Sequence, residues 1–237
     1  MIFVQLGAGV GDQDPSSKYR DGFTELVKKI DDSEKKTYCV EANPKNIEKL
    51  KECWKDFSNV KIFNFAIVPD YMNDDFIEFY YADEDKPYYQ TFSCKLEHVK
   101  KHYPLSNKIN NVKVKTIKVS DFFESNFQKK KIDYLSIDIE GLDFEILKNL
   151  DLNSYNITNI SFEYLHLTKK EKKIIINKLN SYGYSYFGFG IDHNNFDYLF
   201  VKKKFFLNRL ISKIIPFISN KHLKFLNYLI SNNNKLI

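Results

Sequence analysis

Short apolar runs alternate with amphipathic segments along most of the chain. The runs are typical of buried strands, and the segments between them have the spacing of helices. Phe23, Leu26, Val27 and Ile30, for example, recur at i, i+3, i+4 and i+7, which is one face of a helix. The strands predicted in this way cover residues 4–6, 37–40, 60–66, 76–81, 112–119, 132–137 and 159–164, with 76–81 beside 60–66.

Helical segments follow most of these strands. Pro44 suits the first turn of a helix, with Asn43 as its N-cap. Strands that alternate with helices predict an α/β fold with a mostly parallel, doubly wound sheet. Residues 83–111 are polar, aromatic and irregular, which is typical of a long functional loop. Further helices are predicted over residues 120–127, 144–150 and 171–179, and a closing antiparallel hairpin over 184–189 and 196–201.

Composition excludes several classes of protein. Hydrophobic residues make up 43% of the 237 residues, which is enough for a sizeable core and excludes wholesale disorder. No apolar run is long enough to span a membrane, and the first residues resemble a strand that meets a glycine loop rather than a signal peptide. Cys39, Cys53 and Cys94 lack metal-type spacing, so we expect reduced thiols in a cytoplasmic protein.

Positive charge is concentrated in a C-terminal tail, residues 204–237, which follows a main domain over residues 1–203. The tail carries six basic and no acidic residues, while the rest of the chain is close to neutral. Its apolar residues have helical spacing, so the tail could contact an anionic membrane, pack on the domain or form a homo-oligomer. Only Arg20 and Arg209 are arginines, which disfavours specific nucleic-acid binding.

The loop after the first strand has the sequence Gly7-Ala8-Gly9-Val10-Gly11-Asp12. Glycines at this place let a ligand approach the backbone, although a merely tight turn is the alternative. Compared with the dinucleotide-binding pattern, the third glycine comes one residue early and Asp12 stands in its place. A carboxylate there would repel a pyrophosphate and tolerate a sulfonium or ammonium group.

The ends of the next two strands carry further candidates for a nucleoside site. Glu41, at the end of the second strand, could accept two hydrogen bonds from a ribose diol, or it could simply cap the following helix. Phe65 and Ala66, at the end of the third, could flank an adenine ring or belong to the core. Parallel strands end at one edge of a sheet, so these residues are expected to meet there.

The segment Ile132 to Leu147 is the most distinctive part of the sequence. An apolar strand ends in Asp138 and Glu140, which would share one side if the strand continued. Two adjacent carboxylates can raise each other's pKa and provide a general base. Glu163, with His166 after it, ends the next strand. Asp138 and Glu163 could assist the reaction through a metal ion, but no His-rich ligand spacing supports one, so no metal ligands are predicted.

These motifs, in this order, resemble the FkbM family of S-adenosylmethionine-dependent methyltransferases. The resemblance covers about residues 1–203 and rests on Gly7-Ala8-Gly9-Val10-Gly11, Glu41-Ala42-Asn43-Pro44 and Asp138-Ile139-Glu140-Gly141. It implies a Rossmann-like class I methyltransferase fold and methyl transfer to an oxygen of a sugar, glycan or small metabolite. It also implies that Gly7, Gly9 and Glu41 contact S-adenosylmethionine and that Asp138 and Glu140 are the active-site acids.

Three positions depart from the family pattern. Gln5 replaces an aspartate, Ser136 replaces a frequent lysine, and Asp143 replaces a glutamate. These departures leave open a catalytically silent binding or scaffold protein. An NAD-dependent oxidoreductase is disfavoured by Asp12 and the short glycine spacing. We also expect Gly11, Phe65 and Ala66 to contact the cofactor. Taken together, the sequence favours an O-methyltransferase.

Overall fold

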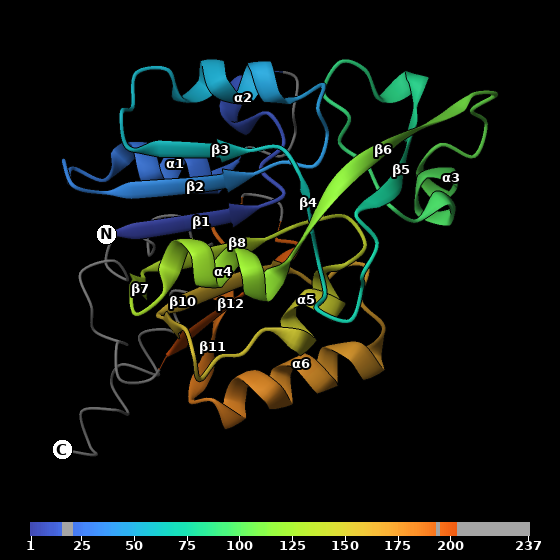
Figure 1. Cartoon of the computed structure of the whole chain (residues 1–237). Helices are drawn as coiled ribbons and strands as arrows, with labels where there is room; N and C mark the ends of the chain where they lie inside the picture. Colours follow the sequence, from blue (N-terminus) through green and yellow to red (C-terminus); the bar gives the residue numbers. More distant parts are fainter. Residues whose placement is uncertain (16–20, 193–194, 203–237) are drawn as a thin grey trace, which may run out of the picture.

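The computed structural model describes residues 1–15, 21–192 and 195–202 (Figure 1). Its main sheet has seven strands in the order β11-β12-β10-β8-β1-β2-β3. All neighbours pair in parallel except β11 with β12 and β12 with β10, so the predicted doubly wound sheet and antiparallel hairpin are confirmed. The strands are β1 (Ile2–Leu6), β2 (Lys36–Val40), β3 (Val60–Phe63), β8 (Tyr134–Ile137), β10 (Asn159–Glu163), β11 (Tyr184–Phe189) and β12 (Asp197–Lys202).

Helices cover both faces of this sheet. The alternation of side chains along β1 shows the two layers: Phe3 packs with Phe23 on one face, while Val4 and Leu6 face the opposite core. On one face lie α1 (Gly22–Lys29) and α2 (Ile47–Trp54). On the other lie α4 (Val119–Phe127), α5 (Asp143–Asn149) and α6 (Lys169–Ser181).

A second sheet corrects the prediction for residues 60–81. It has the order β4-β6-β5 and consists of β4 (Ala66–Val68), β6 (Ile109–Lys118) and β5 (Phe76–Ala82). Residues 60–66 are not one strand, because Asn64 Nδ2 donates to the carbonyl oxygens of Glu41 (2.9 Å) and Ala42 (3.2 Å) where the chain leaves the main sheet. Nor does β5 lie beside β3, since it pairs with β6 along its whole length.

The segment between β5 and β6 is more ordered than predicted. It contains a 3-10 turn (Asp83–Asp85) and α3 (Leu96–His102). The buried Asp85 carboxylate organises it, accepting hydrogen bonds from the Thr91 backbone (2.7 Å), the Thr91 hydroxyl (2.8 Å) and the Tyr103 hydroxyl (2.8 Å). In Figure 1, β5, β6 and α3 gather on the side towards which the arrows of β1, β2 and β3 point.

The start of α2 also differs from the prediction. Asn43 does not cap a helix that begins at Pro44; its Oδ1 accepts from the Lys45 N–H (3.0 Å) within a turn that precedes Ile47. The turn is closed by the Asn46 N–H, which donates to the Asn43 carbonyl (3.1 Å). Because both asparagines are fully buried, this turn is a fixed part of the carboxyl edge of the sheet.

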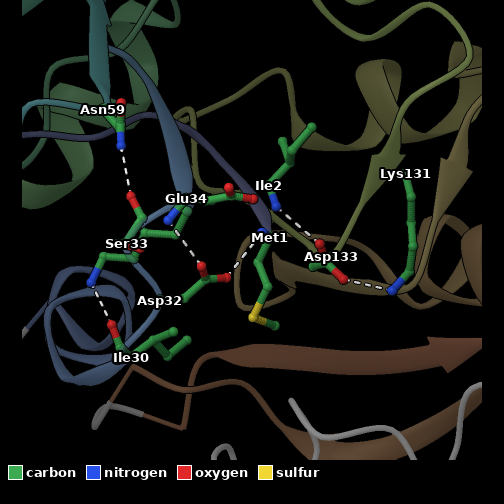
Figure 2. A network of polar contacts seen from close by, with 10 residues as sticks. Met1, Ile2, Ile30, Asp32, Ser33, Glu34, Asn59, Lys131 and Asp133 are labelled. Atoms are coloured by element: carbon green, nitrogen blue, oxygen red, sulfur yellow. Dashed lines mark hydrogen bonds and ion pairs between the residues drawn. The ribbon is translucent and has the colours of Figure 1, made fainter.

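Polar contacts hold the opposite, amino edge of the sheet together, as Figure 2 shows. Asp133 Oδ2 accepts from the Ile2 N–H (2.9 Å), and its Oδ1 accepts from Lys131 Nζ (2.6 Å). Asn59 Nδ2 donates to the Ser33 carbonyl (3.0 Å) beside β2. These contacts fix the strands at one end and leave the carboxyl ends free to build a site.

The basic tail lies outside the described residues, so its predicted helices stay predictions. Within the described part, no helix combines the length and apolar character needed to cross a bilayer. Cys39 and Cys53 are buried and Cys94 is half-buried, and all three are free thiols.

Candidate functional site

A cavity opens at the carboxyl edge of the main sheet. A larger one adjoins it, and the two share Gly7, Gly9, Gln90 and Asp138 as lining residues. Gly11 lines the second cavity. The first is lined by the other candidates from the sequence: Gly7, Gly9, Glu41, Phe65, Ala66, Asp138 and Glu140. The structure therefore brings every candidate site residue to one hollow region.

The glycine turn contains three left-handed glycines. Gly7 has φ +84°, Gly9 has φ +54° and Gly11 has φ +61°, a region that favours glycine. A Cβ on Gly9 would meet nothing within 4 Å, so the backbone there borders open space. The Gly9 N–H donates to Glu41 Oε2 (2.7 Å), which ties the turn after β1 to the end of β2.

Glu41 is a buried carboxylate with two backbone partners. Besides Gly9, it accepts from the Asn43 N–H through Oε1 (2.8 Å). Burial raises its pKa to about 7, against the opposing effect of these two hydrogen bonds. A carboxylate has about four acceptor positions, so capacity remains for ligand hydroxyls at the cavity.

Aromatic side chains form the apolar wall of the first cavity. Phe65 packs against Phe63 and Phe122 at centroid distances of 5.5 and 5.8 Å, while Ala66 lies in the core of the second sheet. Both interpretations of Phe65, core residue and cavity wall, therefore hold together. Tyr88 and Tyr89 also line this cavity.

Asp138 and Glu140 reach the cavity in a different way from the one predicted. The strand ends at Ile137 and Glu140 has φ +52°, so the two do not share a strand face. Asp143 holds the intervening loop: it accepts from the Ile139 N–H (2.9 Å) and the Gly141 N–H (3.2 Å). Burial, reinforced by the charge of Glu140, raises the pKa of Asp138 well above its usual range.

Gln5 has a defined place at the second cavity. Its Nε2 donates to Asp21 Oδ1 (3.2 Å), and Asp21 caps α1 by accepting from the Phe23 N–H (3.1 Å). Among the described residues, Gln5 Oε1 and Asp138 Oδ1 are buried without a hydrogen-bond partner. Each is an acceptor without a donor at the cavity wall, which favours a ligand that supplies donors or positive charge.

Asp12 does not add free negative charge at full strength. Its Oδ2 forms an ion pair with Lys28 Nζ (2.6 Å) at the rim of the second cavity. The repulsion of a pyrophosphate that the sequence predicts is therefore reduced, because Lys28 partly neutralises the charge of Asp12.

Glu163 and His166 lie beside the first cavity, at the end of β10. His166 Nε2 is 3.4 Å from Glu163 Oε1. Burial, reinforced by the charge of Glu140, raises the pKa of Glu163 to about 9, and burial with the neighbouring histidines lowers that of His166 to about 4. Sequence reasoning missed the two other histidines of this region, His98 and His102, because they lie on α3. Their spacing of four residues was the available signal.

The strand order and the site at the carboxyl edge define a class of protein, the Rossmann-like methyltransferases. A family model described as the methyltransferase FkbM domain matches residues 5–186. The chain belongs to the FkbM family of S-adenosylmethionine-dependent methyltransferases, which implies a methyl acceptor as substrate.

Solved methyltransferase structures are similar to this chain at low identity. The precorrin-6y C5,15-methyltransferase of Geobacter metallireducens has a TM-score of 0.40 and 12% identity over 78% of this chain and 64% of that chain. Aeropyrum pernix fibrillarin, in complex with natively bound S-adenosyl-L-methionine, has 0.40 and 11% over 84% and 64%. The fibrillarin pre-rRNA processing protein of Methanococcus jannaschii has 0.38 and 13% over 85% and 66%. This chain thus spans about two thirds of each. Comparison with curated protein sequences finds no match.

The residues at the cavity fit S-adenosylmethionine. Its sulfonium and ammonium groups are cationic, and the unpartnered acceptors Gln5 Oε1 and Asp138 Oδ1 suit such groups. Its ribose hydroxyls suit Glu41, which is buried at the wall of the same cavity. The open space above Gly9 leaves room for a ligand against the backbone.

Proposed function

We propose that this protein transfers a methyl group from S-adenosylmethionine to a hydroxyl oxygen of a sugar, a glycan or a small hydroxylated metabolite. The observation that carries the proposal is that Glu41, the glycine turn and the Asp138–Glu140 pair line one cavity. Because Glu41, proposed for the nucleoside, and the acids Asp138 and Glu140 line the same cavity, the cofactor and the acceptor can lie next to each other.

The nucleoside end of the cofactor is assigned to the region of β2 and the second sheet. Glu41 accepts hydrogen bonds from the ribose diol, and Phe65 with Ala66 forms the apolar wall for the adenine. Gln5 Oε1, which has no donor among the described residues, accepts from the ammonium group in the adjoining cavity.

The reaction demands little covalent chemistry from the protein. S-adenosylmethionine supplies an electrophilic methyl group on a sulfonium. This chain's residues must orient the acceptor oxygen in line with the carbon–sulfur bond, which is mainly proximity and orientation. When bound, the cofactor would supply the methyl group, and the Asp138 carboxylate would take the proton that the acceptor hydroxyl gives up.

The environment of Asp138 supports its role as the base. Asp138 lines the cavity, and its Oδ1 is buried with no hydrogen-bond partner among the described residues, so it can accept a proton from a bound hydroxyl. A nearby positive charge favours the ionised form of a buried acid. The cationic cofactor therefore increases the fraction of Asp138 that is ready to accept a proton. Glu140 lines the same cavity as Asp138.

The test is methyl transfer to a panel of sugars, glycans and small hydroxylated compounds. We expect S-adenosylhomocysteine to accumulate with a hydroxylated acceptor and the product to carry a new O–CH₃ group by mass spectrometry and NMR. Methylation on nitrogen or carbon alone contradicts the proposal. Binding of the cofactor with no turnover on any hydroxylated acceptor favours the silent binding protein instead.

A further inference from the structure

Three histidines gather beside the acidic side of the cavity. His98 and His102 are four residues apart on α3, and so lie on one face of that helix. His166 lies in the turn after β10, a strand of the main sheet. The ring centroids of His98 and His166 are 4.5 Å apart, and those of His98 and His102 are 4.7 Å apart.

Two carboxylates complete this cluster. Glu140 Oε2 lies 2.9 Å from His98 Nε2, and Glu163 Oε1 lies 3.4 Å from His166 Nε2. The potential ligand atoms of Glu140, Glu163 and His166 all lie within 4.8 Å of one another, as do those of the three histidines. The two overlapping triads share His166.

The contact between His98 and Glu140 has the distance of an ion pair but is not a hydrogen bond. Within the described residues, neither His98 Nε2 nor Glu140 Oε2 has a hydrogen-bond partner, and both atoms are buried. The His98 side chain is only 10% exposed. Two buried polar atoms that face each other without a hydrogen bond are costly unless a third group satisfies both.

The cluster is held in place by contacts outside it. The Ser93 hydroxyl, fully buried ahead of α3, donates to the Glu140 carbonyl. Asp143 fixes the loop that carries Glu140, and Tyr103, directly after α3, is bound to Asp85. The segment with the two α3 histidines is thereby attached to the ends of the sheet strands, so the cluster is preorganised rather than assembled from mobile side chains.

We propose that Glu140, Glu163 and His166 bind one divalent first-row transition-metal ion, such as Zn²⁺, and that His98 is a further ligand, reached through its contact with Glu140. Imidazole nitrogens with carboxylate oxygens suit zinc and its neighbours better than Mg²⁺ or Ca²⁺, which prefer oxygen alone. Bonds of the usual length to a tetrahedral zinc place neighbouring ligand atoms about 3.3 Å apart. The two separations of 2.9 and 3.4 Å lie on either side of that value, and the other ligand atoms of the Glu140, Glu163 and His166 triad lie within 4.8 Å of one another.

This proposal changes the role of one candidate residue. Glu140 holds the ion through Oε2, and Asp138 remains the carboxylate that takes the proton. The ion links the segment between β5 and β6 to β8 and β10, so its binding is measurable whether or not an acceptor for methyl transfer is known. It does not depend on the proposed O-methylation.

The experiment uses the full chain, stripped of metal with a chelator and dialysed. Zn²⁺ is titrated by calorimetry, and Co²⁺ is titrated while its visible d–d absorption is recorded. We expect one equivalent of each to bind, with the absorption of a four- or five-coordinate cobalt centre. We expect metal binding to weaken at least about 10-fold in each of His98→Ala, His166→Ala and Glu163→Gln. Loss of a group that only hydrogen-bonds to a metal ligand already weakens binding about 10-fold or more, so loss of a ligand should cost at least as much.

Glu97→Gln is the matched control, because Glu97 adjoins His98 on α3 but is 83% exposed and pairs with Lys100. It should leave metal affinity unchanged. Circular dichroism and melting in the presence of chelator show whether each variant is folded, and Glu163→Gln keeps the size and hydrogen bonding of the side chain. The proposal is overturned if the folded wild type binds no stoichiometric metal. It is also overturned if binding survives these substitutions undiminished.

Discussion

The backbone of Asp138 fills the space in which a side chain on Gly7 would lie: a Cβ on Gly7 would be 1.6 Å from the Asp138 carbonyl oxygen. The Asp138 N–H in turn donates to the Leu6 carbonyl (2.9 Å). The glycine turn and the acidic strand end are thus in direct backbone contact. In the proposed function, this contact sets how closely the nucleoside site and the proton acceptor can approach each other.

Gly7→Ala should therefore damage both stability and cofactor binding. The new methyl group meets backbone that cannot rotate away, and φ +84° is strained for alanine. Together these effects should lower the free energy of unfolding by about 2–5 kcal/mol. Urea unfolding followed by circular dichroism measures it.

Gly9→Ala is the matched control for this prediction. Gly9 also has positive φ, but a Cβ there meets nothing within 4 Å. We expect a loss of only about 1–2 kcal/mol, from the backbone conformation alone. Equal losses for the two variants would show that the contact with Asp138 does not constrain the turn.

Glu41 should make the protein less stable as pH rises. Its folded pKa of about 7 lies above the unfolded value of 4.5, so the folded state binds the extra proton and loses this advantage between about pH 4.5 and 7. Between pH 5 and 8 this corresponds to about 2 kcal/mol. In Glu41→Gln the decline in unfolding free energy over that range should be smaller by this amount.

Other buried acids contribute to the same pH dependence, so the comparison is between variant and wild type at each pH. Identical pH profiles for both would show that Glu41 titrates normally. Glu41→Gln should also weaken S-adenosylhomocysteine binding, since an amide accepts fewer hydrogen bonds from a ribose diol than a carboxylate does.

Restoring the family's aspartate at position 5 should be harmful here. Gln5 Nε2 donates to Asp21, which is half-buried, so Gln5→Asp would place two carboxylates together. We expect a loss of about 2–4 kcal/mol at neutral pH. Gln5→Asn has the size of aspartate without the charge and should lose less. If the two variants are equally stable at neutral pH, the pairing of Gln5 with Asp21 does not govern this position.

The main sheet and most of the site followed from the sequence because they depend on local signals. Apolar runs located the strands of the main sheet, and the rule that ligands bind at carboxyl ends brought Glu41 and Asp138 together. The order of the strands places both residues at one edge, whatever the connections between them contain.

The segment between β5 and β6 could not be predicted in the same way. Its order comes from the buried carboxylate of Asp85, which gathers Thr91 and Tyr103, and such a polar centre leaves no periodic pattern. The two histidines of α3 therefore stayed unconnected to Glu140, although they lie in the same cluster. The sequence-based expectation of no metal arose from this gap and is a prediction that the titrations above test.

The most direct test of the account compares wild type with Asp138→Asn in two measurements: calorimetric binding of S-adenosylhomocysteine, and turnover with an acceptor found in the panel. We predict binding within a few-fold of wild type and a turnover lowered about 10²–10⁴-fold, the usual contribution of a general base. Wild-type turnover in Asp138→Asn would contradict the account.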